Sequence, residues 1–166
     1  MYLFAAPVLW GIVAFLLSRQ WSEILQIINI LFFIVCISVI LYLTLFSRKV
    51  YTHDPVLIPF HFLIEAREQP ELYRSMLMNV FLFMPYGLSL SFALPSSISP
   101  PILWTVASAI LFSLLIEMAQ YCFLLGRAEV DDIIMNTLGT LIGSSAFLIR
   151  NQLMKMQRTI PNHTPR

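Results

Sequence analysis

Amide and carboxylate side chains stand at matching ends of three apolar stretches of this 166-residue chain. Asn79 lies near the start of the first stretch, and Glu117 and Gln120 lie late in the second. Asp131, Asp132 and Asn136 lie at the opening of the third. A carboxylate inside a membrane costs about 2.5–3.5 kcal/mol on insertion scales, so such groups need polar partners and usually mark function. Together they are able to position water, stabilise charge or supply a general base.

The elements that must position these groups are membrane-spanning helices. Hydrophobic residues make up 58% of the chain and charged residues 11%, and the mean hydropathy is +0.80. These values exclude an ordinary soluble domain, and a chain of this length forms one compact bundle. We predict an all-α, polytopic helical membrane protein with a single membrane domain over 1–166. A net charge of +1 without a basic block argues against nucleic acid as a partner.

Five apolar stretches are long enough, or nearly so, to cross the ~30 Å hydrocarbon core of a bilayer. They are Tyr2–Ser18, Ile24–Phe46, Met76–Leu94, Ile102–Leu125 and Ile133–Ile149. A chain that crosses back and forth brings the start of the third, the end of the fourth and the start of the fifth to one membrane face. The polar groups at those ends can then find partners in one another.

Charge counting does not orient these five spans. The face that carries the N-terminus would hold five basic residues, namely Arg48, Lys49, Arg67, Arg74 and Arg127. The opposite face would hold five as well, namely Arg19, Arg150, Lys155, Arg158 and Arg166. This is a tie under the positive-inside rule. The tail 150–166 has no acidic residue, which favours a cytoplasmic tail.

The longest connection, Ser47–Ser75, mixes charged residues with many aliphatic and aromatic ones. This mixture favours a folded or interfacial loop over a floppy linker. His53 and His61, taken with Asp54 or Glu65, match no metal-ligand spacing, so we expect no metal site. The chain also lacks a phosphate-binding glycine loop and a dinucleotide fingerprint, so we expect no cofactor.

Glu117 and Gln120 lie three residues apart and therefore share one helical face. At 1.5 Å per residue, Glu117 sits roughly 13 Å inside Gly126, which predicts a place close to the bilayer centre. The alternative to a functional role is a hydrogen bond to Asn79 or Asn136 that only locks the bundle. The serines of the spans are expected to bond back to their own helices.

Two further features are structural. Gly139 and Gly143 form a GxxxG pattern, which lets another helix backbone approach closely. Pro85, followed by Gly87, is predicted to kink its helix because proline cannot donate a backbone hydrogen bond and clashes with the preceding turn.

Four segments resemble motifs of VanZ-like membrane proteins. The sequence NVFLFMPYG at 79–87 resembles their N-x-x-x-F-x-P-[FY]-G signature, and LIPF at 57–60 resembles their N-L-I-P-F stretch. EMAQ at 117–120 resembles the E-x-x-Q motif, and GRAEVDDIIMNTLG at 126–139 resembles the R-x-x-D-x-x-D-[IV]-x-x-N-x-x-G block. The resemblance covers about 57–149.

The chain departs from the family pattern in three places. The family's asparagine is replaced by Val56, and there is an extra N-terminal span at 2–18. The family has two acidic residues three apart, whereas Asp131 and Asp132 are adjacent here, so Glu129 stands in for the first acid.

The resemblance implies a protein integral to the cytoplasmic membrane, with the motif loops and the N-terminus outside and the C-terminus inside. It therefore implies a polar site that opens toward the extracytoplasmic face. The predicted members of this site are Asn79, Glu117, Gln120, Arg127, Asp132 and Asn136, with Glu129 and Asp131 at its rim. Arg127 is expected to pair with Glu117 or Asp132 and to bind an anionic head group, because a guanidinium matches phosphate with two hydrogen bonds.

The resemblance also implies a role in the cell envelope, since the eponymous members are associated with low-level teicoplanin resistance. One function class is a factor that binds or modifies a lipid-linked or anionic head group, with membrane lipids and a lipid-linked cell-wall precursor as partners. The alternative is an intramembrane hydrolase or transferase that uses Glu117 or Asp132 as general base. A small transporter is disfavoured by the short chain.

Overall fold

The computed structural model describes residues 22–46, 55–67, 71–94 and 100–159. Within these ranges the regular elements are all helices, and one isolated bridge joins Val56 to Glu129. The predicted span Tyr2–Ser18 and the last residues of the predicted tail, 160–166, lie outside the described residues.

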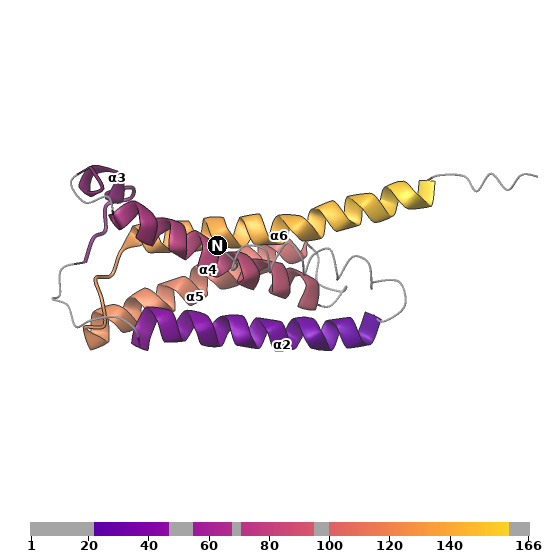
Figure 1. Ribbon diagram of the computed structural model, residues 1–166, viewed down its shortest axis with the longest axis horizontal. Helices are drawn as coiled ribbons and strands as arrows, with labels where there is room; N and C mark the ends of the chain where they lie inside the picture. Colours follow the sequence, from indigo (N-terminus) through magenta and orange to yellow (C-terminus); the bar gives the residue numbers. More distant parts are fainter. Residues whose placement is uncertain (1–21, 47–54, 68–70, 95–99, 160–166) are drawn as a thin grey trace, which may run out of the picture.

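Four long helices lie side by side and alternate in direction (Figure 1). They are α2 (Ser22–Leu41), which continues into the π-helix η2 (Tyr42–Phe46), then α4 (Glu71–Ala93), α5 (Pro101–Phe123) and α6 (Val130–Thr159). The short helix α3 (Phe62–Glu65) lies near the start of α4. In the described part of the chain, four helices are long and apolar enough to cross a membrane. The predicted all-α polytopic membrane protein is confirmed.

All four long helices begin earlier than the apolar pattern predicted, and α4 and α6 show the largest differences. α4 begins at Glu71 instead of Met76, and α6 begins at Val130 instead of Ile133. Acidic residues occupy the first turn of each, and a negative charge there interacts favourably with the positive end of the helix dipole. α6 also continues to Thr159, so residues 150–159 of the predicted tail are helical.

α4 and α6 make the most extensive contact in the described bundle. Glycines face the opposite backbone at this contact. A Cβ atom added to Gly139 would collide with the carbonyl oxygen of Val80, one on Gly143 with that of Met84, and one on Gly87 with that of Thr140. The small residues therefore set how closely the two helices approach. α4 passes through Pro85 as one helix, and the predicted kink there stays a prediction.

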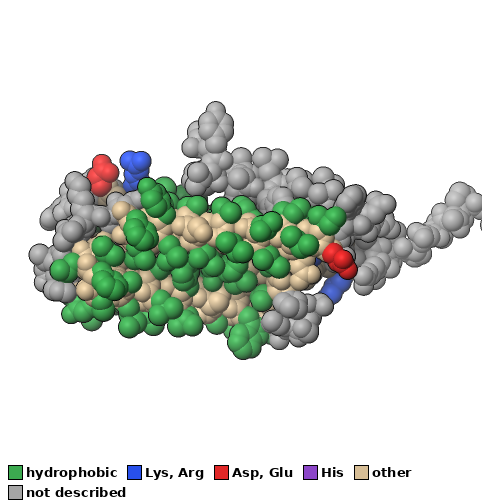
Figure 2. All heavy atoms as spheres, turned by 90° about the horizontal axis from the view of Figure 1, so that it is seen from below, with side chains coloured by type: hydrophobic (Ala, Val, Ile, Leu, Met, Phe, Trp, Pro, Cys, Tyr) green, Lys and Arg blue, Asp and Glu red, His purple; other side chains and the backbone are tan. Residues whose placement is uncertain are grey.

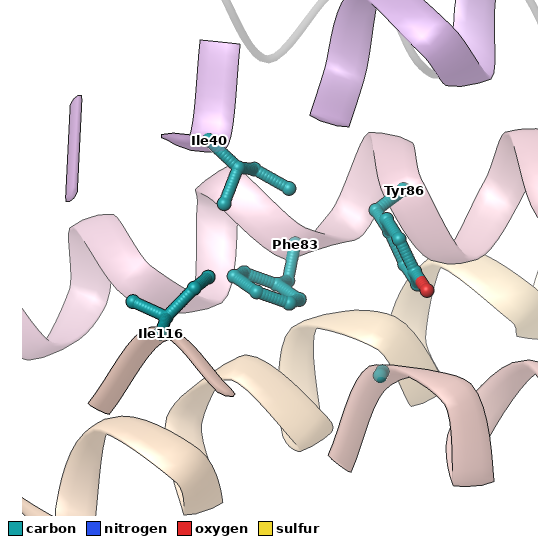
Figure 3. Packing of buried hydrophobic residues seen from close by; sticks show 5 residues of the cluster. Ile40, Phe83, Tyr86 and Ile116 are labelled. Carbon is teal, nitrogen blue, oxygen red and sulfur yellow. The ribbon is translucent and has the colours of Figure 1, made fainter. Parts of the chain in front are cut away.

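An apolar cluster joins α2, α4 and α5 (Figure 3). Ile40, Phe83 and Ile116 are almost completely buried in it. Tyr86 extends the cluster, with its ring 5.6 Å from that of Phe83 and its hydroxyl 3.0 Å from Ser108 Oγ. This cluster holds the three helices together next to the polar residues, since Ile116 directly precedes Glu117 in α5.

The outer surface of the bundle is apolar, whereas the surface of a soluble protein is largely polar. Figure 2 shows a nearly continuous hydrophobic face, with charged side chains only toward its two ends. Large apolar residues such as Ile27, Leu31 and Leu111 are more than half exposed on it. Such a band matches the hydrocarbon layer of a bilayer.

Candidate functional site

In the described part of the chain, the buried carboxylates and several buried polar residues belong to the end of the bundle where α2 and α5 finish and α4 and α6 begin. Figure 1 shows these helix ends together. We call this region the polar end. It is defined by Thr44, Asn79, Ser113, Glu117, Gln120, Asp132 and Asn136. These seven residues come from four helical segments and are all buried.

A hydrogen bond between side chains joins α4 to α6 at the polar end. Asn79 Nδ2 donates to Asp132 Oδ1 at 2.7 Å, and both residues are buried. The bond is possible because the glycine contacts of α6 bring its first turns close to α4. A charged acceptor makes such a bond roughly twice as strong as a neutral one.

A second bond joins α6 to α5 one turn along. Asn136 lies four residues after Asp132, and its Nδ2 donates to Ser113 Oγ at 2.8 Å. The sequence reasoning missed Ser113, because it expected serines in the spans to bond to their own helices. Ser38 and Ser89 do so. The available signal was that Ser113 precedes Glu117 by one helical turn.

Glu117 is held by a backbone group of the connection between α5 and α6. Its Oε2 accepts a hydrogen bond from the N–H of Glu129 at 2.8 Å. Glu129 immediately precedes α6, so the carboxylate lies level with this connection. The backbone of the connection therefore returns to Glu117, and the predicted position of this side chain close to the bilayer centre stays a prediction.

Gln120 links α5 to the end of the first described span. Its Nε2 donates at 3.0 Å to the carbonyl oxygen of Thr44, which lies in the π-helix η2. Single π-helical turns occur often at functional sites. Because Gln120 is fully buried, this bond fixes its amide between two helices.

Asp131 is buried and does not lie at a rim. Its two carboxylate oxygens accept hydrogen bonds from the backbone N–H groups of Phe60 and of Phe62, the latter at 3.1 Å. The exposed fraction of Asp131 is 1%, which corrects the predicted rim position. The adjacent Asp132 points to α4 instead, so two neighbouring carboxylates hold two different segments in place.

Arg127 forms the more exposed part of the site. Its Nη2 donates to Glu65 Oε1 at 2.9 Å, and its Nε lies 3.4 Å from Glu129 Oε1. All three side chains are partly buried. The predicted pairing of Arg127 with Glu117 or Asp132 stays a prediction. From the sequence, Glu65 was considered only as a metal ligand, so its pairing with Arg127 was not predicted. The described residues hold no group of three or more His, Cys, Asp or Glu side chains suited to a metal ion.

The polar end and its surroundings hold many hydrogen-bond acceptors, and one buried donor, Arg127 Nε, has no hydrogen-bond partner among the described residues. Five carboxylates belong to this region, those of Glu65, Glu117, Glu129, Asp131 and Asp132. Two buried amide oxygens, Gln120 Oε1 and Asn136 Oδ1, have no hydrogen-bond partner among the described residues. A buried polar atom without a partner costs about 1–3 kcal/mol, so a group that donates hydrogen bonds would be bound favourably here.

Comparison with known proteins gives two matches. The sequence model of the VanZ/LLP1 family matches residues 29–151, which include every residue of the polar end. Protein VanZ of Enterococcus faecium is 29% identical over 86 residues, which are 52% of this chain and 52% of that protein. The matched stretch thus spans about half the length of this curated relative. No solved structure matches the chain.

Proposed function

The chain belongs to the VanZ/LLP1 family, and from that premise we propose that its polar end binds the head group of a membrane lipid or of a lipid-linked cell-wall precursor. The observation that carries this proposal is the pair of buried amide oxygens, Gln120 Oε1 and Asn136 Oδ1, in a region rich in carboxylates. Such a site takes hydroxyl or ammonium groups, which donate hydrogen bonds.

The same charges argue against a head group that carries only negative charge. Arg127 is already bound to Glu65 and Glu129, and additional carboxylates lie nearby. A phosphate is therefore expected to contribute through Arg127 only when the same head group also donates hydrogen bonds. Sugar and amine groups attached to a lipid phosphate meet this requirement.

A binding site of this kind accounts for an effect on teicoplanin susceptibility. Teicoplanin binds cell-wall precursors, so a protein that engages a lipid-linked precursor at the extracytoplasmic face changes what the antibiotic can reach. The proposal places the polar end outside the cytoplasm, with the C-terminus inside.

Reporter fusions test this orientation. Alkaline phosphatase, which is active only outside the cytoplasm, should be active when fused within 65–71 and inactive when fused after 158. A cytoplasmic reporter such as green fluorescent protein should give the opposite pattern, because the two positions flank an odd number of crossings. Phosphatase activity after 158 would reverse the orientation and remove the site from the extracytoplasmic face.

Substitutions of Glu117 distinguish a binding role from a catalytic role. Glu117→Gln keeps an oxygen that can accept the Glu129 N–H, so lipid binding should survive in this variant. Glu117→Ala leaves that N–H unsatisfied at a cost of about 1–3 kcal/mol to the folded connection before α6, so the polar end should lose its arrangement and less lipid should copurify. The measurement is mass spectrometry of lipids and precursors that copurify with the protein, together with teicoplanin sensitivity of cells expressing each variant or none.

Ser108→Ala is the matched control, since it removes a hydroxyl of α5 that bonds to Tyr86 outside the polar end. Each variant is also checked for thermal unfolding. A folded Glu117→Gln protein that loses all function would point to a general base and to the enzyme alternative. Identical precursor pools and teicoplanin sensitivity with and without the protein would contradict the envelope role.

A further inference from the structure

Residues 55–67, between η2 and α4, expose an unusual amount of apolar surface. Five large apolar side chains in this stretch point outward, those of Leu57, Ile58, Phe60, Leu63 and Ile64. Phe60 is 52% exposed, and Leu57 reaches 69%. The sequence from 56 to 64 contains no Asp, Glu, Lys or Arg. A water-exposed loop is rarely so apolar.

Hydrogen bonds attach the segment to the bundle, so the exposure of its apolar side chains does not result from a poorly packed backbone. The N–H of Val56 donates to the carbonyl of Ala128 at 2.9 Å, and the carbonyl of Val56 accepts from the N–H of Val130 at 3.1 Å. Asp131 accepts the two further backbone N–H groups, and Glu65 pairs with Arg127. Together these contacts hold the segment over the connection between α5 and α6.

One residue of this segment has a backbone conformation that is rare for residues other than glycine. Phe60 has φ of 61°, in the left-handed region, where non-glycine residues are uncommon. The carboxylate of Asp131 accepts the N–H of this residue. This hydrogen bond stabilises the strained backbone, while the aromatic ring of Phe60 stays half exposed. Strained residues of this kind concentrate where function requires a fixed orientation.

We propose that residues 55–67 lie in the interfacial layer of the bilayer, with the five exposed apolar side chains inserted among the lipids. The segment connects helices that cross the membrane, so it stands at the level where hydrocarbon gives way to head groups. Apolar and aromatic side chains gain stability by partial insertion at this level. A lipid that approaches the polar end past this segment therefore meets an apolar surface before it meets Arg127 and Glu65.

Fluorescence quenching in vesicles tests this placement. The starting variant carries Cys122→Ala, which removes the exposed native thiol, while the remaining Cys36 is buried. Labelling of this variant alone gives the background. Single cysteines are introduced as Leu57→Cys or Ile64→Cys and labelled with an environment-sensitive fluorophore in the full chain. The vesicles contain phosphatidylethanolamine and phosphatidylglycerol. Both labels should show blue-shifted emission, protection from aqueous iodide, and stronger quenching by a nitroxide near the head group than by one deep in the acyl chain.

Glu71→Cys is the matched control, because Glu71 is exposed at the start of α4, and its label should be quenched by iodide. Iodide quenching at 57 and 64 as strong as at 71 would overturn the proposal. Stronger quenching by the deep nitroxide would also overturn it, since the segment would then be buried in hydrocarbon. Thermal unfolding of each unlabelled variant checks that the fold is kept. Head-group binding is measured separately, by the lipids and precursors that copurify with the protein, so failure of this placement and failure of head-group binding are distinguishable.

Discussion

Replacing Gly139 with valine should destabilise the protein strongly. Even the Cβ atom of the new side chain would overlap the carbonyl oxygen of Val80, which belongs to backbone and cannot rotate away. α4 and α6 would have to separate, and overpacking of this kind costs about 1–3 kcal/mol, occasionally more. Thermal unfolding of the purified protein in detergent measures the loss, and a lower yield in membranes should accompany it.

Ser145→Val provides the matched control on the same helix. Ser145 is exposed and donates to the carbonyl of Ile142 in its own helix. A valine there adds similar bulk on the lipid-facing side and should leave the unfolding temperature nearly unchanged. Equal unfolding temperatures for Gly139→Val and the unaltered protein would mean that the close contact of α4 with α6 is not needed for stability.

Asp131→Ala should release the segment 55–67 while the four long helices remain folded. The backbone N–H groups of Phe60 and Phe62 lose their acceptor, and each unsatisfied buried N–H costs about 1–3 kcal/mol. Because 1.4 kcal/mol corresponds to a factor of ten, amide hydrogen exchange in this segment should become about ten- to a hundredfold faster. Hydrogen–deuterium exchange followed by mass spectrometry of peptides covering 55–67 reads this directly.

Asp132→Asn is the neighbouring control. Asparagine keeps an oxygen that can accept from Asn79, and the N–H groups of Phe60 and Phe62 donate to Asp131. Exchange in 55–67 should therefore stay at its original rate in this variant. If Asp132→Asn speeds exchange as much as Asp131→Ala does, the separate roles of the two carboxylates are wrong.

The general architecture was accessible from the sequence because apolar length alone identifies spanning helices. The antiparallel path also follows from the order of the spans, and it explains why Asn79 and Asp132 could be expected on one face. The resemblance to the family came from residue order within these same segments. Each of these inferences uses side-chain type and spacing, which the sequence states directly.

The partners of the polar groups were harder to predict, because several of them are backbone atoms. Glu117 accepts from the Glu129 N–H, and Gln120 donates to the Thr44 carbonyl. Every residue except proline carries a backbone N–H and every residue carries a carbonyl, so the sequence does not distinguish the ones that will be used. The path of the backbone after Phe123 decides the first of these bonds, and the packing of η2 against α5 decides the second. Both depend on tertiary structure.

The π-helical turn Tyr42–Phe46 ties the fold to the number of residues in the chain. Hydrogen bonds in a π-helix close over five residues instead of four, so such a turn is equivalent to one residue inserted into an α-helix. Removing one residue there would restore the α-helical pattern and rotate α2 by about 100° relative to the residues after the turn. Ile40 would then leave the apolar cluster, or the Thr44 carbonyl would turn away from Gln120. A relative that is one residue shorter at this point must therefore either move its equivalent of Ile40 out of the cluster or pair its equivalent of Gln120 differently, even where every other aligned position is the same.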